Sequence, residues 1–119
     1  MKIYFTSILF LFFLVGCIST HQSEHPSPEE MLKIDGADIF LLGGYVYSNA
    51  EDVNWVTELD YTLGKQIGEI SKQSSKASGF KNGTANKLPV GTMIYETNTP
   101  AFIVIVNGIE IPYIKMVEG

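Results

Sequence analysis

Two apolar segments near the C-terminus, 101–106 and 109–117, flank Asn107-Gly108 and constrain the fold more than any other feature. Asn-Gly accepts positive φ at both positions, which is typical of a two-residue turn between antiparallel strands. The turn pairs Val106 with Ile109 and thereby fixes which side chains share a face. This register predicts one apolar face that forms the core, made of Phe102, Val104, Val106, Ile109, Ile111 and Tyr113.

The second face of this hairpin carries Ile103, Ile105, Glu110 and Pro112. We expect Ile103 and Ile105 to tolerate substitution better than the core face does, unless a helix or loop covers them. Proline lacks a backbone N–H and is found mainly on edge strands. The last strand is therefore predicted to be an edge of its sheet at Pro112.

Short strand-like segments also fill the rest of the chain from Ile34. The segments 38–42 and 45–47 flank Gly43-Gly44, which favours a tight hairpin, with one strand containing a glycine bulge as the alternative. Asn49 is a suitable N-cap for a helix over 50–56, and 57–63 then alternates between apolar and polar residues as a strand does.

Further along, Gly64-Lys65 is interpreted as a turn into a returning strand at 66–71. The polar segment 72–79 is predicted to be a mobile surface loop, and another strand is predicted at 92–96. Together these patterns predict a mainly β, antiparallel domain of six or seven short strands with one short helix. A small open barrel is one form that such a sheet can take.

The N-terminal segment 3–15 is almost wholly apolar and follows Lys2. A membrane-spanning helix needs about 20 apolar residues, so this segment is too short to span a bilayer. Its length and flanks are typical of the hydrophobic region of a secretory signal. An ordinary signal peptide and an uncleaved anchor are the alternatives that treat the following cysteine as incidental.

The motif Leu14-Val15-Gly16-Cys17 resembles the lipobox of bacterial lipoproteins, and Cys17 is the only cysteine of the chain. The resemblance implies acylation of the Cys17 thiol and cleavage just before it. We therefore expect residues 1–16 to be a lipoprotein signal peptide. The mature protein would be anchored through lipid on the extracytoplasmic face of the cell membrane.

Residues 17–33 are polar, contain two prolines and show no apolar period, which predicts a flexible tether before a domain at 34–119. His21 and His25 lie in this segment at a spacing that can ligate a metal on a helix. Pro26 and Pro28 argue against a helix there, so we interpret both histidines as solvated.

The charge balance excludes some classes of partner. The chain has a net charge of −5 and no arginine, and loss of residues 1–16 removes only Lys2 among the charged residues. Nucleic-acid binding depends on clustered Lys and Arg, so we expect no nucleic-acid partner. An acidic surface suits a cationic peptide or a cation, although many acidic surfaces serve only solubility.

Few residues that carry catalysis are present in the predicted domain. From Ile34 onward there is no histidine, cysteine or arginine, which excludes Ser-His and Cys-His nucleophilic arrangements there. The acidic segments 35–38 and 52–54 lack the ligand spacing of an EF-hand loop, and no carboxylate pair stands out as a glycosidase pair. We therefore predict a non-enzymatic protein without a metal or cofactor.

Aromatic residues are the remaining candidates for binding. Tyr47 and Trp55 are the preferred pair, because a loop is predicted between them, although strand packing is the commoner role of such residues. The favoured hypothesis is a surface lipoprotein that binds or sequesters an extracytoplasmic peptide or protein. Binding of cell-wall glycan through exposed aromatics and a structural role in a membrane complex are the alternatives.

A second resemblance concerns the segments Asn82-Gly-Thr-Ala and Lys87-Leu-Pro-Val-Gly-Thr-Met-Ile-Tyr-Glu. They are similar to segments of small uncharacterised lipoproteins of Gram-positive bacteria. This resemblance implies the same localisation, and it implies no activity and no functional residues.

Overall fold

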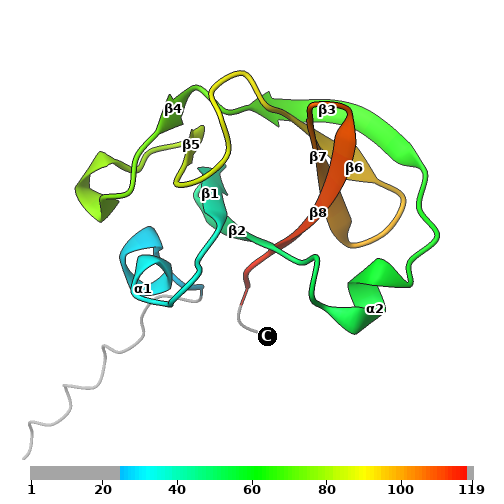
Figure 1. Cartoon of the computed structure of the whole chain (residues 1–119), viewed down its shortest axis with the longest axis horizontal. Coiled ribbons are helices and arrows are strands. Elements are labelled where there is room, and N and C mark those ends of the chain that lie inside the picture. The colour runs from blue at the N-terminus through cyan, green and yellow to red at the C-terminus, as the bar shows by residue number, and fades with distance from the viewer. Residues whose placement is uncertain (1–24, 118–119) are drawn as a thin grey trace, which may run out of the picture.

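The computed structural model describes residues 25–117. The predicted signal peptide, Cys17 and the first part of the predicted tether therefore lie outside the described residues. Eight strands and two short α-helices make up most of the described chain, together with one 3₁₀ turn (Figure 1). In chain order the elements are α1 (Pro28–Leu32), β1 (Ile39–Leu42), β2 (Tyr45–Asn49), α2 (Asn54–Thr57), β3 (Leu63–Glu69), β4 (Lys72–Gln73), η3 (Ala77–Gly79), β5 (Thr84–Ala85), β6 (Met93–Thr97), β7 (Ala101–Val106) and β8 (Ile109–Lys115).

All eight strands belong to one mixed sheet with the order β3-β6-β7-β8-β2-β1-β5-β4. Neighbouring strands are antiparallel except β4 and β5, which are parallel. The sheet curls into a half-barrel (Figure 1), which confirms the prediction of a mainly β fold. The predicted strand number was too low, because β4 and β5 are only two residues long and carry no recognisable period.

The two end strands of the sheet, β3 and β4, follow each other directly in the chain. Only Ile70 and Ser71 separate them. The Ile70 N–H donates to the carbonyl of Thr92 just before β6, and the Ser71 N–H donates to the carbonyl of Gly83 just before β5. The chain itself therefore links the two ends of the curled sheet, and Ile70 is completely buried at this link.

The core lies inside the curl of the sheet. Phe40 stacks on Tyr47 with ring centroids 4.7 Å apart, and Tyr113 packs against Phe40 at 5.1 Å. The buried residues of this core cluster are Phe40, Tyr47, Ile70, Ala85, Leu88, Ile94, Val104 and Tyr113. This cluster draws on six of the eight strands and on the link at Ile70, so it holds the sheet in its curled form.

Both predicted two-residue hairpins are confirmed. Gly43 and Gly44 have φ of 62° and 85°, and they join β1 to β2 with Leu42 paired with Tyr45. Asn107 and Gly108 have φ of 52° and 78°. The strand pairing of β7 with β8 also follows the predicted register, from Val106 with Ile109 to Phe102 with Tyr113.

The burial of the two hairpin faces differs from the prediction. Ile109 was expected in the core but is 62% exposed beside the turn, whereas Ile103 on the second face is completely buried. That face is covered near its base, because Ala101 and Ile114 pack in a second cluster with Val56 of α2. The core assignment was therefore wrong for Ile109, and Ile103 is one of the buried residues although it lies on the second face.

The predicted edge at Pro112 is only partly correct. β8 lies inside the sheet between β7 and β2, with Asn49 of β2 paired with Tyr113. The pairing with β2 stops there, and Pro112 accepts one further bond, from the Ala50 N–H. The missing N–H of Pro112 thus ends this pairing locally but does not make the whole strand an edge.

Within 50–71, the strand predicted at 66–71 is present as part of β3, whereas the other predictions are wrong in their bounds or their type. α2 covers Asn54–Thr57 with Val53 as its N-cap, because Asn49 is held in the sheet as the end of β2. No strand forms over 57–62, and β3 runs through Gly64 without a turn. A side chain at Gly64 would approach Glu96 on β6 to 3.0 Å, so this glycine serves close packing between strands.

The end of the predicted tether is also folded. Pro28–Leu32 form α1 with a capping box, in which the Glu30 N–H donates to Ser27 Oγ and the Ser27 N–H donates to Glu30 Oε1. Met31 is buried in a cluster with Ile39 and Val46. The folded domain therefore begins before Ile34, and the predicted tether 17–33 is too long at its C-terminal end.

The predicted surface loop 72–79 contains β4 and η3. The Gln73 side-chain amide donates to the carbonyls of Lys87 and Leu88 at 3.1 Å, and the Ser74 N–H donates to the carbonyl of Ala85 at 2.9 Å. Its polar composition concealed this order, because the segment is held by hydrogen bonds and buries little apolar surface.

Candidate functional site

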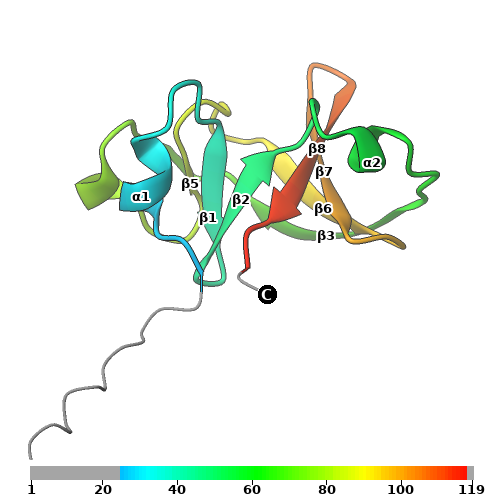
Figure 2. The same cartoon turned by 90° about the horizontal axis from the view of Figure 1, so that it is seen from below.

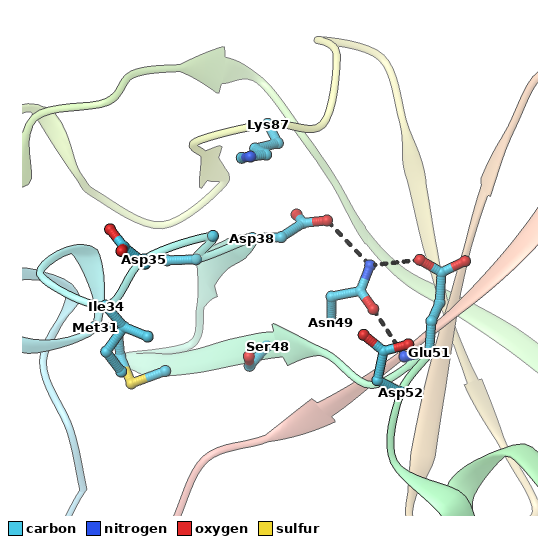
Figure 3. Close-up of a pocket in the computed structure, with 11 residues that line it drawn as sticks. Met31, Ile34, Asp35, Asp38, Ser48, Asn49, Glu51, Asp52 and Lys87 are labelled. Atoms are coloured by element: carbon cyan, nitrogen blue, oxygen red, sulfur yellow. Dashed lines mark hydrogen bonds between the residues drawn. The ribbon is translucent and has the colours of Figure 1, made fainter.

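The candidate site is a pocket of about 370 Å³ beside the first residues of β1 and the last residues of β2. Three segments form it, namely the loop between α1 and β1, the chain from β2 toward α2, and Lys87 after β5 (Figure 3). Its lining comprises Met31, Ile34, Asp35, Gly36, Ala37, Asp38, Ser48, Asn49, Glu51, Asp52 and Lys87. Four carboxylates and one ammonium group thus share the pocket.

Asp38 is the best-fixed carboxylate of the pocket. Its Oδ1 accepts a hydrogen bond of 2.6 Å from the Tyr113 hydroxyl, and its Oδ2 accepts one of 3.0 Å from Asn49 Nδ2. Asn49 also donates to Glu51 Oε1 at 3.1 Å, while its Oδ1 accepts the Glu51 N–H at 2.7 Å (Figure 3). One asparagine therefore holds two carboxylates in place at the end of β2.

Tyr113 connects the pocket to the core. Its ring is completely buried in the core cluster, while its hydroxyl reaches Asp38. Burial raises the pKa of Tyr113 well above its ordinary value, and the hydrogen bond to Asp38 and its negative charge raise it further. The tyrosine therefore acts as a neutral donor that fixes the Asp38 carboxylate.

The other acidic side chains of the pocket face solvent. Asp35, Glu51 and Asp52 are exposed, as is Lys87 on the opposite side of the pocket. Met31 and Ile34 add an apolar wall, and Ile34 is 55% exposed. The pocket thus combines unneutralised negative charge with apolar surface, which suits the ammonium group and methylene chain of a lysine-like ligand.

The carboxylates of the pocket are not grouped as metal ligands are. Within residues 25–117, no group of three or more His, Cys, Asp and Glu side chains is placed to hold a metal ion. The histidine of that range, His25, lies away from the pocket and packs against Tyr45 with ring centroids 4.6 Å apart. The carboxylates and the apolar wall of the pocket can make electrostatic and apolar contacts with a ligand.

No protein-family model matches the chain, and neither a curated protein nor a solved structure matches it. In the described part of the chain, the helices are all too short or too polar to cross a membrane.

The predicted binding residues are not brought together. Tyr47 is only 5% exposed and lies in the core, so the structure contradicts its prediction as a partner-binding residue. Trp55 on α2 is 52% exposed and remains available. Cys17 lies outside the described residues, so its acylation stays a prediction.

Sequence reasoning missed the pocket itself. Asp35, Asp38 and Asp52 were compared only with the spacing of an EF-hand loop, which requires all ligands in one short segment. The pocket instead joins the two ends of the β1–β2 hairpin, and the pairing of β1 with β5 adds Lys87 from a remote part of the chain. The one local signal was the acidic content of 35–38 at the start of a predicted strand and of 51–52 in the predicted helix.

Proposed function

We propose that the protein is a lipid-anchored, non-enzymatic binding protein that holds a basic peptide segment of an extracytoplasmic partner. The observation that carries this proposal is the pocket at the end of β2, where Asp35, Glu51 and Asp52 expose their carboxylates beside Met31 and Ile34. A lysine side chain of the partner would place its methylenes on the apolar wall and its ammonium group among the carboxylates.

Glycan binding is the alternative, and it depends on Trp55. Sugar rings stack on exposed aromatic side chains, usually on several that form one surface. Among residues 25–117, Trp55 is the one aromatic side chain that is largely exposed, and the other aromatics are half-buried or buried. The balance of exposed groups therefore favours a basic peptide over a glycan.

Asp35→Asn with Asp52→Asn should weaken the binding of a lysine-rich probe peptide about five- to thirty-fold, because each exposed charge contributes about 0.5–1 kcal/mol. Fluorescence anisotropy with the full-length protein in detergent would measure the dissociation constant. The effect should shrink as salt is raised, since salt screens exposed charges.

Glu58→Gln with Asp60→Asn is the matched control, because it makes the same change in charge at exposed positions outside the pocket. An equal loss in both double variants would show that the peptide responds only to net charge. Loss of binding to cell-wall glycan in Trp55→Ala, with peptide binding absent throughout, would instead support the glycan alternative.

Replacing Cys17 by serine should release the protein from the membrane, because the lipobox resemblance makes Cys17 the site of acylation. We expect the membrane-bound fraction to fall about tenfold or more, since the short apolar segment 3–15 cannot span a bilayer. Ultracentrifugation of cell extracts measures this fraction, and intact-mass analysis reports the acyl chains. A Cys17→Ser protein that remained firmly membrane-bound would contradict the anchor.

A further inference from the structure

The domain has two distinct ends along the direction of β1 and β2. At one end lie the Gly43-Gly44 turn, Tyr45 and the last described residue Val117, and we call this the turn end (Figure 2). At the other end β1 begins and β2 ends, beside the acidic pocket. Four strand steps separate Tyr45 from Asn49, which corresponds to about 13 Å.

The described chain enters the domain at the turn end. His25 packs on the ring of Tyr45 with centroids 4.6 Å apart, next to the turn. Cys17 precedes His25 by eight residues, so whatever path the chain takes, it spans at most about 28 Å between them. A lipid on Cys17 would therefore keep the turn end within about 28 Å of the bilayer. Because this length exceeds the distance between the two ends, the orientation depends on the surface chemistry of the turn end as well.

The turn end also has the composition of a membrane-contacting surface. Lys115 Nζ lies 4.6 Å from the centroid of the Tyr45 ring, and Val117 is 57% exposed beside it. Tyrosine and lysine combine an apolar body with a polar tip, and both are favoured where lipid headgroups meet water. Lys115 is exposed and can approach lipid phosphates, whereas the carboxylates of the pocket would be repelled by them.

We infer that the turn end rests on the headgroups of the membrane, with Tyr45 and Lys115 in contact with them, and that the acidic pocket points away from the bilayer. This inference rests on the proposed lipid anchor at Cys17. The lipid anchor and the charges of the two ends favour the same orientation. The anchor holds the turn end down, and anionic lipids push the pocket outward, where a partner in solution or in the cell wall can reach it.

Fluorescence quenching in vesicles tests this orientation. Acylation consumes the Cys17 thiol, so a single introduced cysteine is the only free thiol for a fluorophore. Val117→Cys places the probe at the turn end and Asp52→Cys places it at the pocket, and both positions are exposed. The acylated full-length variants would be reconstituted in phosphatidylglycerol–phosphatidylcholine vesicles that contain a lipid with a nitroxide on its headgroup.

We expect the probe at Val117 to be quenched at least about twofold more than the probe at Asp52, and Lys115→Gln to reduce the difference. Equal quenching at both positions, or stronger quenching at Asp52, would overturn the inference. Intact-mass analysis and vesicle flotation keep the two proposals separate. A protein without acyl chains that fails to float contradicts the anchor, whereas an acylated protein that floats with equal quenching contradicts only the orientation.

Discussion

Replacing Ile103 by alanine is expected to lower the free energy of unfolding by about 2–5 kcal/mol, because it removes a completely buried aliphatic side chain and leaves a cavity. The loss would be a large part of the stability of a small domain, which is roughly 5–10 kcal/mol. Denaturant titration of the chain without residues 1–16, carrying Cys17→Ser, would measure it.

Ile105→Ala is the matched control for this variant. Ile105 lies on the same face of β7, two residues nearer the Asn107-Gly108 turn, and is only partly buried. Its replacement should cost less than half as much as that of Ile103. Equal costs would mean that the difference in burial between Ile103 and Ile105 is not kept in solution.

Tyr113→Phe should have the second large effect on stability. It removes the 2.6 Å hydrogen bond to Asp38 and leaves Asp38 Oδ1 without this donor, at a cost of about 1–3 kcal/mol at neutral pH. The aromatic ring is kept, so the core packing with Phe40 is retained. Urea titration at neutral pH measures this part of the effect.

The same variant should also change the response to alkaline pH. In the folded protein the pKa of Tyr113 is raised above the ordinary 10.0, so above about pH 10 the unfolded chain loses this proton while the folded chain keeps it. The stability that comes from the raised pKa is complete below pH 10 and falls as pH rises above it, by about 1.4 kcal/mol per pH unit for one group.

Above about pH 10, the unfolding free energy of Tyr113→Phe should therefore fall less steeply with pH than that of the unmodified chain. The difference in slope corresponds to one proton, about 1.4 kcal/mol per pH unit. Tyr61 supplies the control, because its pKa is raised to about 12, chiefly by its hydrogen bond to Glu110, but its side chain is far less buried. Tyr61→Phe should change the slope less. An alkaline slope in Tyr113→Phe equal to that of the unmodified chain would contradict the role assigned to this hydroxyl.

The sequence predicted the parts of the fold that depend on short-range chemistry. Gly43-Gly44 and Asn107-Gly108 require positive φ, and this local requirement was enough to locate two hairpins and one complete strand register. The burial of Ile103 could not be predicted in the same way. Ile103 lies opposite Tyr95 of β6 and Pro112 of β8, and its burial depends on the tertiary packing over the second face of the hairpin, which the local pattern does not reveal.

The helix α1 and the acidic pocket were not predicted for the same physical reason. Ser27 and Glu30 formed a readable capping box, but a helix of five residues is stable only through packing, and the partners of Met31 lie on β1 and β2. The pocket likewise needs Asp35, Asp52 and Lys87 from three segments. Each acidic residue looked like ordinary surface charge, and only the completed sheet places them around one space.

The link at Ile70 and Ser71 bears on how the domain avoids self-association. An open sheet exposes unpaired edges that can recruit a second copy, and short end strands reduce that hazard. Here one edge strand, β4, is only two residues long. Only Ile70 and Ser71 connect it to the other edge strand, β3. A protease cut between Ile70 and Ser71 would remove no strand, but β3 would then be held only by its pairing with β6 and by side-chain packing such as that of Ile70.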